Sequence, residues 1–252
     1  MSNYDQDRLQ QTQYGASARA GIDEGLRSYM LRVYNYMAGG LALTGFIAYF
    51  TFQAATQETA QGLMLTSFGQ TIYQSPLAWV IMLSPLAFVL VLSFGINKLS
   101  LGTSQILFWA FAGVMGLSLS SIFLRFTGES ITTTFFVTAA AFGSLSLYGY
   151  TTKRDLSPIG SFLIMGLIGL VIAMVVNIFL QSSAMQFAIS AIGVLIFAGL
   201  TAWDTQRIKE MYFAGDSAVV AGKKAIMGAL ALYLDFINLF MFLLQFMGNQ
   251  RN

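Results

Sequence analysis

The most constraining feature of this sequence is the length of its stretches without a charged side chain. No Asp, Glu, Lys or Arg occurs in Val33–Gln57, Thr59–Asn97, Leu99–Leu124, Ser130–Thr152 or Leu156–Trp203. Charged residues make up 10% of the 252 residues, whereas an ordinary soluble domain contains about 25%. A soluble domain needs such charge on its surface, so the uncharged stretches exclude a soluble globular enzyme and predict a helical protein that crosses the membrane several times.

Seven apolar segments of roughly 20 residues each are long enough to cross a hydrocarbon core of about 30 Å as helices. The predicted spans are Val33–Phe52, Leu77–Ile96, Gln105–Leu124, Ile131–Tyr150, Ile159–Leu180, Met185–Gln206 and Ala225–Met247. Pro85 lies inside the second span and predicts a kink there. We therefore expect a polar tail over residues 1–30 and a seven-helix transmembrane domain over residues 31–250.

The entry into the first span is open to two interpretations. Ile22, Leu26, Tyr29, Met30 and Val33 recur at helical spacing. They fit a short helix lying in the membrane interface, or the N-terminal end of the first transmembrane helix itself.

The positive charges predict the orientation of the chain. With seven spans, eleven Lys and Arg lie on the side of the N-terminus and two on the other side. Cytoplasmic loops carry an excess of Lys and Arg, so the N-terminus should be cytoplasmic and the C-terminus external. The eleven are Arg8, Arg19, Arg27, Arg32, Lys98, Lys153, Arg154, Arg207, Lys209, Lys223 and Lys224, and the two are Arg125 and Arg251.

The chain contains no His and no Cys. This excludes a Ser–His–Asp triad, a Cys nucleophile and His- or Cys-ligated zinc or iron. There is no P-loop and no dinucleotide fingerprint, and a net charge of +2 gives no support for a nucleic-acid partner. We therefore expect neither an enzyme nor a bound cofactor.

Three spans carry small or polar side chains at spacings of three and four. Because small residues let helices approach closely in lipid, these faces should form the interior of the bundle. A packing role without any further function remains open for the glycines. The residues are Gly166, Gly169, Ala173 and Asn177 in the fifth span, Gly113, Gly116 and Ser120 in the third, and Gly228, Ala231, Asp235, Asn238 and Gln245 in the seventh.

Two acidic residues in consecutive spans are the candidate functional residues. Asp235 lies about ten residues, or ~15 Å, into the seventh predicted span. An ionised carboxylate at that depth costs several kcal/mol unless it is paired, solvated or protonated. Asp204 ends the sixth span beside Trp203 and Arg207. Asp235 could alternatively make a structural hydrogen bond between helices, and Asp204 could be an ordinary membrane-edge residue.

If Asp204 and Asp235 meet, they cannot both ionise cheaply, so we expect them to share one proton. Loss of that proton would create repulsion or an oxygen-rich site for a cation such as calcium. For the two to touch, the seventh helix must begin below the membrane surface, on the cytoplasmic side, or the sixth helix must break.

Four strings between Gly116 and Phe240 are distinctive. They are Gly116–Phe123 (GLSLSSIF), Tyr148–Ser157 (YGYTTKRDLS), Trp203–Gln206 (WDTQ) and Leu232–Phe240 (LYLDFINLF). Together they resemble the signature segments of the Bax inhibitor-1 family, and Tyr148–Ser157 resembles the bacterial inner-membrane branch in particular. The resemblance extends from about Leu26 to the C-terminus.

The resemblance implies an all-α membrane protein of seven transmembrane helices, with six packed around a central seventh, located in the bacterial inner membrane. It also implies a pH-sensitive calcium leak in which Asp204 and Asp235 are the pH-sensing pair. Some bacterial members carry a Glu and an Arg near the second helix, whereas Leu83–Phe88 here contains neither. Four polar residues on the same stripes or beside Asp204 are candidate supporting side chains: Thr205, Arg207, Asn238 and Asn177.

Two other functions are compatible with this pattern of residues. Certain bacterial relatives associate with a membrane AAA protease, so the chain could be a regulator without transport activity that docks through its N-terminal tail or the 54–75 loop. An intramembrane aspartyl protease also carries one Asp on each of two consecutive helices. Such enzymes require a Gly-x-Gly-Asp motif, whereas Leu232, Tyr233 and Leu234 precede Asp235.

Overall fold

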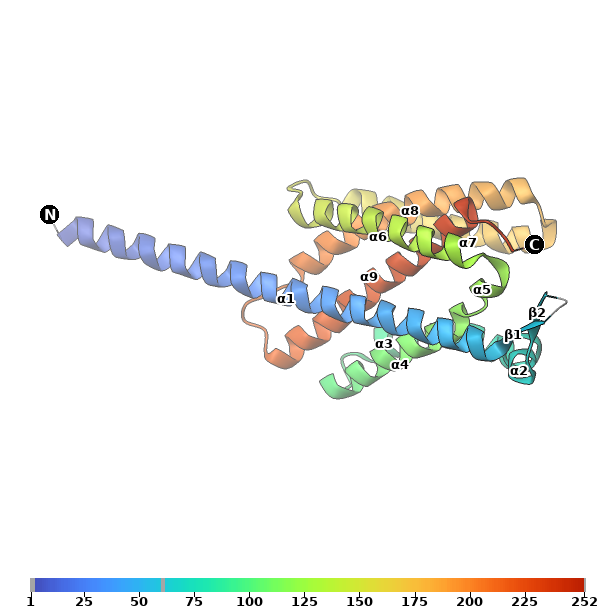
Figure 1. Cartoon of the computed structure of the whole chain (residues 1–252). Helices are drawn as coiled ribbons and strands as arrows, with labels where there is room; N and C mark the ends of the chain where they lie inside the picture. The colour runs from blue at the N-terminus through green and yellow to red at the C-terminus, as the bar shows by residue number, and fades with distance from the viewer. Residues whose placement is uncertain (1–2, 60–61, 252) are drawn as a thin grey trace.

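The structure is a computed structural model that describes the backbone of residues 3–59 and 62–251, and side chains from residue 24 onward within those ranges. Nearly all of it is helical, as Figure 1 shows. In chain order the elements are α1 (Asn3–Ala55), β1 (Thr56–Thr59), β2 (Gly62–Leu65), α2 (Ser67–Gln74), α3 (Leu77–Gly95), α4 (Leu101–Leu119), α5 (Ile122–Arg125), α6 (Gly128–Thr151), α7 (Ser157–Leu180), α8 (Ser183–Glu210) and α9 (Ala218–Met247).

Seven segments are long and apolar enough to cross a membrane, which confirms the prediction of seven spans. Five of them agree with the predicted bounds to within four residues at each end. The span in α1 begins at Glu24 and α9 begins at Ala218, which is nine and seven residues before the predicted starts. Both extensions are too polar to register as apolar segments, but neither contains a residue that stops a helix.

The first span continues the preceding segment without a break, because α1 is one helix from Asn3 to Ala55. The residues from Ile22 to Val33 therefore belong to the N-terminal end of the first transmembrane helix and not to a separate interfacial helix. Tyr29, Met30 and Val33 are buried against the bundle, as their helical spacing predicts. The N-terminal part of α1 projects beyond the other helices in Figure 1.

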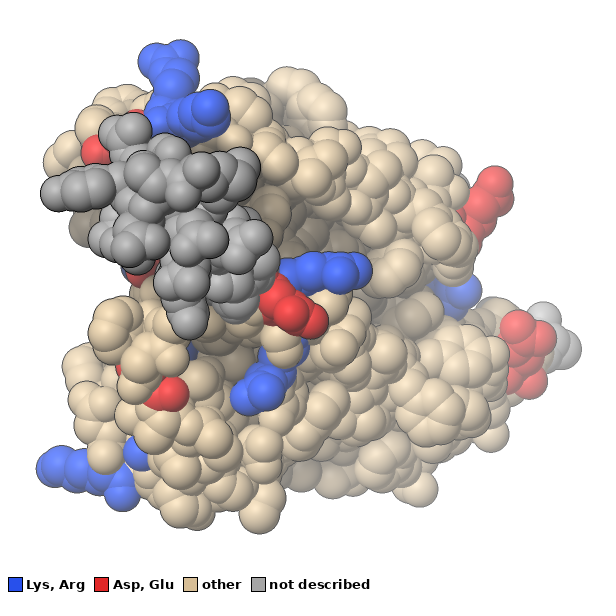
Figure 2. All heavy atoms as spheres, turned by 90° about the vertical axis from the view of Figure 1, so that its left-hand side faces the viewer, with Lys and Arg blue, Asp and Glu red and all other residues tan. Residues whose placement is uncertain are grey.

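The two ends of the bundle differ in charge. We call the end that holds residue 24 and the loops 96–100, 152–156 and 211–217 the tail face, and the end that holds the β1–β2 hairpin the hairpin face. Figure 2 looks onto the tail face, where Lys and Arg side chains gather. The loops that were predicted to share one side therefore lie together. Which compartment this face meets stays a prediction.

The helix α9 is the centre of the bundle. Two thirds (67%) of the residues in its apolar segment are buried, against at most 39% in the other spans. The helices α1, α4, α6 and α8 pack directly on α9, and it runs through the middle of the molecule in Figure 1. This confirms the arrangement around a central seventh span, with α7 packed mainly on the outside of α8 and α3 mainly on α4.

A two-residue turn joins α7 to α8. Gln181 takes a left-handed conformation there (φ 49°), and the Ser182 hydroxyl accepts a hydrogen bond from the amide of Met185 at the start of α8. The side chain of Asn177 accepts a bond from the Ser182 amide at 3.1 Å. The two helices consequently form a tight antiparallel pair.

The helix α3 continues through Pro85. A proline has no N–H, so the carbonyl oxygen of Ile81, four residues earlier, loses its helical partner. The hydroxyl of Ser84 donates to that oxygen at 2.9 Å and replaces the missing bond.

Two glycines permit close contacts between the backbones of membrane-spanning helices. A Cβ at Gly149 in α6 would overlap the carbonyl oxygen of Ala202 in α8, and a Cβ at Gly116 in α4 would lie 2.7 Å from the carbonyl oxygen of Thr44 in α1. Gly116 therefore faces the interior as predicted. Gly169 does not, since a Cβ there meets no atom within 4 Å. It points outward because α7 is covered by protein mainly on the side of α8.

We predict that Gly149→Ala will lower the free energy of unfolding by about 1–3 kcal/mol, because backbone must shift to make room for the methyl group. Thermal unfolding of the detergent-purified protein measures the change. The matched control Gly169→Ala adds the same methyl group in open space and should leave stability unchanged or raise it slightly. Equal effects in both variants would contradict the close α6–α8 contact.

Candidate functional site

Asp204 lies on the last turns of α8, near the tail face, and is 8% exposed. Its Oδ1 atom is 2.8 Å from Nη2 of Arg207, one turn further along the same helix, in an ion pair without a directed hydrogen bond. The Arg207 guanidinium also lies over the ring of Trp203, 4.8 Å from its centroid. Because the Arg207 side chain is 48% exposed, it links the buried carboxyl group to the surface of the protein.

Asp235 lies on α9 and is 4% exposed. Its carboxyl group neighbours the Asp204 carboxyl group. An ionised carboxylate can only accept hydrogen bonds, so a bond between the two groups requires a proton on one of them. The Oδ2 atom of Asp235 has no hydrogen-bond partner among the described residues. The structure thus brings the two predicted aspartates together in the protein interior.

The register of α8 and α9 explains how two acids at different predicted depths can meet. Gly228 packs against Ile208, and Gly193 packs against the ring of Phe242. The helix α8 is unbroken from Ser183 to Glu210, so the predicted alternative of a break in the sixth span does not occur. Instead, α9 starts about 10 Å earlier than predicted (seven residues at 1.5 Å each) and extends past the end of α8.

Two neighbours of Asp204 fix the surrounding backbone. Trp203 covers Gly160 of α7, where a side chain would collide with the indole ring. The Gln206 amide donates to the carbonyl oxygen of Arg154 and accepts from the amide of Leu156, both at 2.8 Å. Gln206 therefore ties α8 to the loop between α6 and α7. Sequence reasoning missed this role, although Gln206 belongs to the polar string at the end of α8.

Thr205 faces away from the acids and joins three helices through hydroxyl groups. Its Oγ1 atom lies 2.9 Å from the Ser146 hydroxyl in α6, and that hydroxyl lies 2.6 Å from the Tyr34 hydroxyl in α1. Thr205 also donates to the carbonyl oxygen of Thr201. The residue supports the packing of α8, and no described contact joins it to either carboxyl group.

Asn177 lies at the opposite end of the bundle from Asp204. Its amide donates to Gln186 at 3.2 Å, and Gln186 donates to Gln245 at 2.7 Å. These amides line a cavity of about 510 Å³ near the hairpin face, which Asn238 also lines. Asn238 donates to the carbonyl oxygen of Leu234 in its own helix. The structure therefore does not bring Asn177 to the aspartate pair, while Asn238 stands one helical turn from Asp235.

The aspartate pair supplies only part of a calcium site. Calcium takes about six to eight oxygen ligands, and no cluster of three or more His, Cys, Asp or Glu side chains occurs among the described residues. Asp204 and Asp235 provide up to four carboxylate oxygens, so water or backbone oxygens would have to complete the shell.

Comparison with known proteins places the chain in a family. The family profile described as "Inhibitor of apoptosis-promoting Bax1" matches residues 26–252. The chain belongs to the Bax inhibitor-1 family. This confirms the resemblance drawn from the four sequence strings.

Several bacterial relatives match nearly the whole chain. The inner membrane protein YbhL of Escherichia coli K12 is 47% identical over 233 residues, which cover 90% of this chain and 94% of the relative. An uncharacterized protein of Rickettsia prowazekii, RP147, is 50% identical, with 92% and 93% of the two chains covered. A membrane protein of Streptococcus pyogenes is 33% identical, with 90% and 94% covered. This chain is thus similar to these relatives over more than nine tenths of their length.

We predict that Gln206→Ala will speed hydrogen exchange at the amide of Leu156 and lower stability by about 1–3 kcal/mol, because the buried Leu156 amide and the Arg154 carbonyl group both lose their partner. Exchange measured by mass spectrometry on peptides that span the α6–α7 loop tests this. The control Gln105→Ala removes a side chain that bonds only the Tyr36 hydroxyl, and exchange in that loop should be unchanged.

Proposed function

We propose that this Bax inhibitor-1 family protein is a pH-sensitive cation leak channel, with calcium as the permeant ion, and that Asp204 and Asp235 form its gate. The observation that carries the proposal is the proximity of two buried carboxyl groups, one on the central helix α9 and one on α8. Two carboxylates rarely share an apolar site unless a proton is exchanged there.

In the proposed mechanism, a proton shared by the two carboxyl groups holds α8 against α9 and closes the tail-face end of the pathway. When the pH rises, loss of the proton leaves two carboxylates that repel each other, and Arg207 is the nearest cation to offset that charge. The separated carboxylates then attract cations. Asn238, one turn from Asp235, lines the cavity near the hairpin face together with other amides and Arg125. The amide oxygens of this cavity support the pathway, since such oxygens are also ligands for hard cations.

The proposed location is the inner membrane, with the tail face toward the cytoplasm. Two observations support it. The Escherichia coli relative is named an inner membrane protein. The Lys and Arg residues gather on the tail face, as cytoplasmic loops do in bacterial membrane proteins. No catalytic activity is proposed, and neither is a resident cofactor.

A second candidate function is regulation of a partner such as a membrane AAA protease, without ion transport. The projecting N-terminal part of α1 favours it, because a helix clear of the bundle can be reached by another protein. Removal of residues 2–20 should then abolish co-purification of the partner. If calcium flux is also absent from the isolated intact protein, this function replaces the channel.

We predict that calcium flux into proteoliposomes will increase as the pH is raised. In Asp235→Asn the flux should stay low at every pH. The asparagine amide can donate a hydrogen bond to Asp204 at every pH, as the protonated carboxyl group does. Flux is measured with a calcium-sensitive dye inside the vesicles. An unchanged pH profile in the variant would reject the aspartate gate.

The matched control is Asp155→Asn, which makes the same substitution at an exposed acid on the tail face. The backbone amide of Ser157 bonds the Asp155 carboxylate and lowers its pKa, so this group stays ionised over the range tested. The control should keep the pH profile of the native protein. If it flattens the profile as well, the response comes from the surface charge of the tail face rather than from the buried pair.

A further inference from the structure

A groove runs between α1 and α6 on the membrane-facing side of the bundle. Both helices pack on α9. Their other main contacts are with different helices, since α1 packs on α4 and α6 packs on α8. The space between them is a groove of about 740 Å³ with Phe236 of α9 among its lining residues. Its walls are largely apolar, with Met30 and Met37 on one side and Phe142 and Leu147 on the other. A volume of this size falls within the range of about 300–1,000 Å³ that is usual for small-molecule sites.

The groove has the length of one membrane leaflet. Along α1 its lining extends from Arg27 to Ala38, and along α6 from Tyr150 to Ala139. Eleven residues at 1.5 Å each give about 16 Å on either wall, or roughly half of a 30 Å hydrocarbon core. It begins at the tail face and ends near the middle of the bundle, so an extended acyl chain of a single lipid fits it from end to end.

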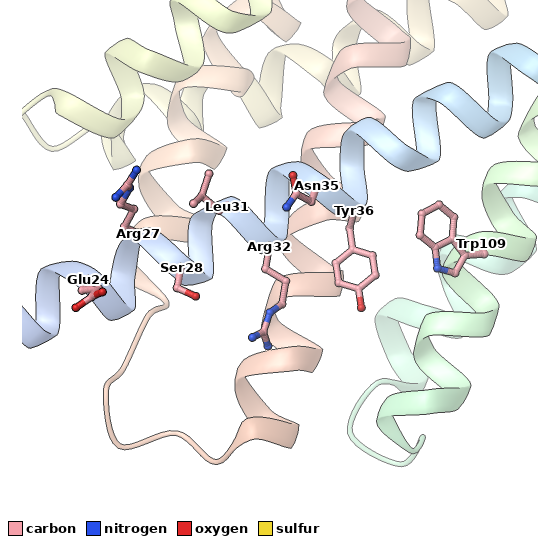
Figure 3. Close-up of a pocket in the computed structure, with 8 residues that line it drawn as sticks. All are labelled: Glu24, Arg27, Ser28, Leu31, Arg32, Asn35, Tyr36 and Trp109. Carbon is pink, nitrogen blue, oxygen red and sulfur yellow. The ribbon is translucent and has the colours of Figure 1, made fainter.

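The chemistry of the groove is polarised along its length. Two cations lie near the tail-face end, one in the lining of the groove and one on α8, outside the lining but in contact with Tyr150. One is Arg27, which Figure 3 shows pointing away from Arg32 and Tyr36 on the other side of α1. The other is Lys209, whose Nζ atom donates to the Tyr150 carbonyl oxygen at 2.7 Å and lies 5.0 Å from the centroid of its ring. Both partners of Lys209 are neutral, so its positive charge remains available to an anion.

The deep end of the groove carries no charge. Ala139 and Phe236 line it, and a smaller cavity of about 300 Å³ continues the same crevice toward the hairpin face without any charged side chain in its lining. The one polar spot along the groove is the pair of hydroxyl groups on Tyr34 and Ser146, 2.6 Å apart. This arrangement fits a ligand with a long apolar chain and an anionic head at the tail face.

We propose that the α1–α6 groove is a binding site for an anionic phospholipid of the tail-face leaflet, with one acyl chain in the groove and the phosphate near Arg27 and Lys209. Charge complementarity decides between this ligand and a zwitterionic lipid. Each Lys or Arg near the surface strengthens attraction to anionic lipid by an amount that corresponds to about fivefold in affinity. The site does not depend on whether the protein conducts ions.

Native mass spectrometry of the full-length protein in detergent tests the proposal, with dioleoyl phosphatidylglycerol and dioleoyl phosphatidylcholine as the two probes. Gly143 lines the groove and a Cβ there meets no atom within 4 Å, so Gly143→Leu fills the groove without disturbing the packing of the helices. We expect this variant to lose the tightest bound phosphatidylglycerol. Arg27→Gln and Lys209→Gln should each weaken that binding about fivefold and leave phosphatidylcholine unaffected.

Two matched controls separate the groove from general lipid contact. Gly169→Leu adds the same side chain at an open position on α7, and Lys98→Gln removes a cation elsewhere on the tail face. Neither should change phosphatidylglycerol binding. Equal binding of the two lipids by the native protein, unchanged binding in Gly143→Leu, or the same loss in Gly169→Leu would each overturn the proposal. Unaltered unfolding temperatures verify that every variant is folded.

Discussion

The enclosure of α9 by other helices is the constraint on which the rest of the structure depends. A transmembrane helix that faces lipid can carry apolar side chains alone, but an enclosed helix must find partners inside the protein for every polar group it carries. Two of these groups on α9 are Tyr233 and Asp235. The Tyr233 hydroxyl lies 2.6 Å from the Thr44 hydroxyl, which in turn donates to the carbonyl oxygen of Ala112. Asp235 meets Asp204. The central helix is thus fastened to α1 and α4 by a neutral link and to α8 by one that can ionise.

These two links differ in chemistry. The link from Tyr233 through Thr44 contains hydroxyl groups and a backbone carbonyl, and Phe108 and Phe111 enclose the tyrosine ring. The link between α8 and α9 is built from two carboxyl groups, and in the proposed gate it is the one that responds to pH. Under that proposal α8 is the part of the bundle that moves, while α1 and α4 stay attached to α9.

The sequence predicted the class of fold and the seven spans, and it singled out Asp204 and Asp235 as the buried acids. It could do so because long uncharged runs admit few structures, and because an acid deep in such a run needs a partner. The starts of α1 and α9 were placed too late, since polar helical turns outside the membrane have no hydropathy signal. The grouping of Asn177 with the aspartates failed for a different reason. A stripe of residues shows which face of a helix is buried, but not which end of the bundle it reaches. Likewise, the role of Gln206 and the α1–α6 groove depend on how helices distant in sequence are placed, which spacing within one helix does not reveal.

The tight turn between α7 and α8 has a mechanical consequence. Two helices joined by Gln181 and Ser182, with Asn177 bonded across the turn, move as one body. Because α7 is the outer member of that pair, the proposed opening of α8 away from α9 would carry α7 outward and enlarge the area that the protein occupies in the membrane. A gate of this kind would respond to lateral tension and lipid packing as well as to pH.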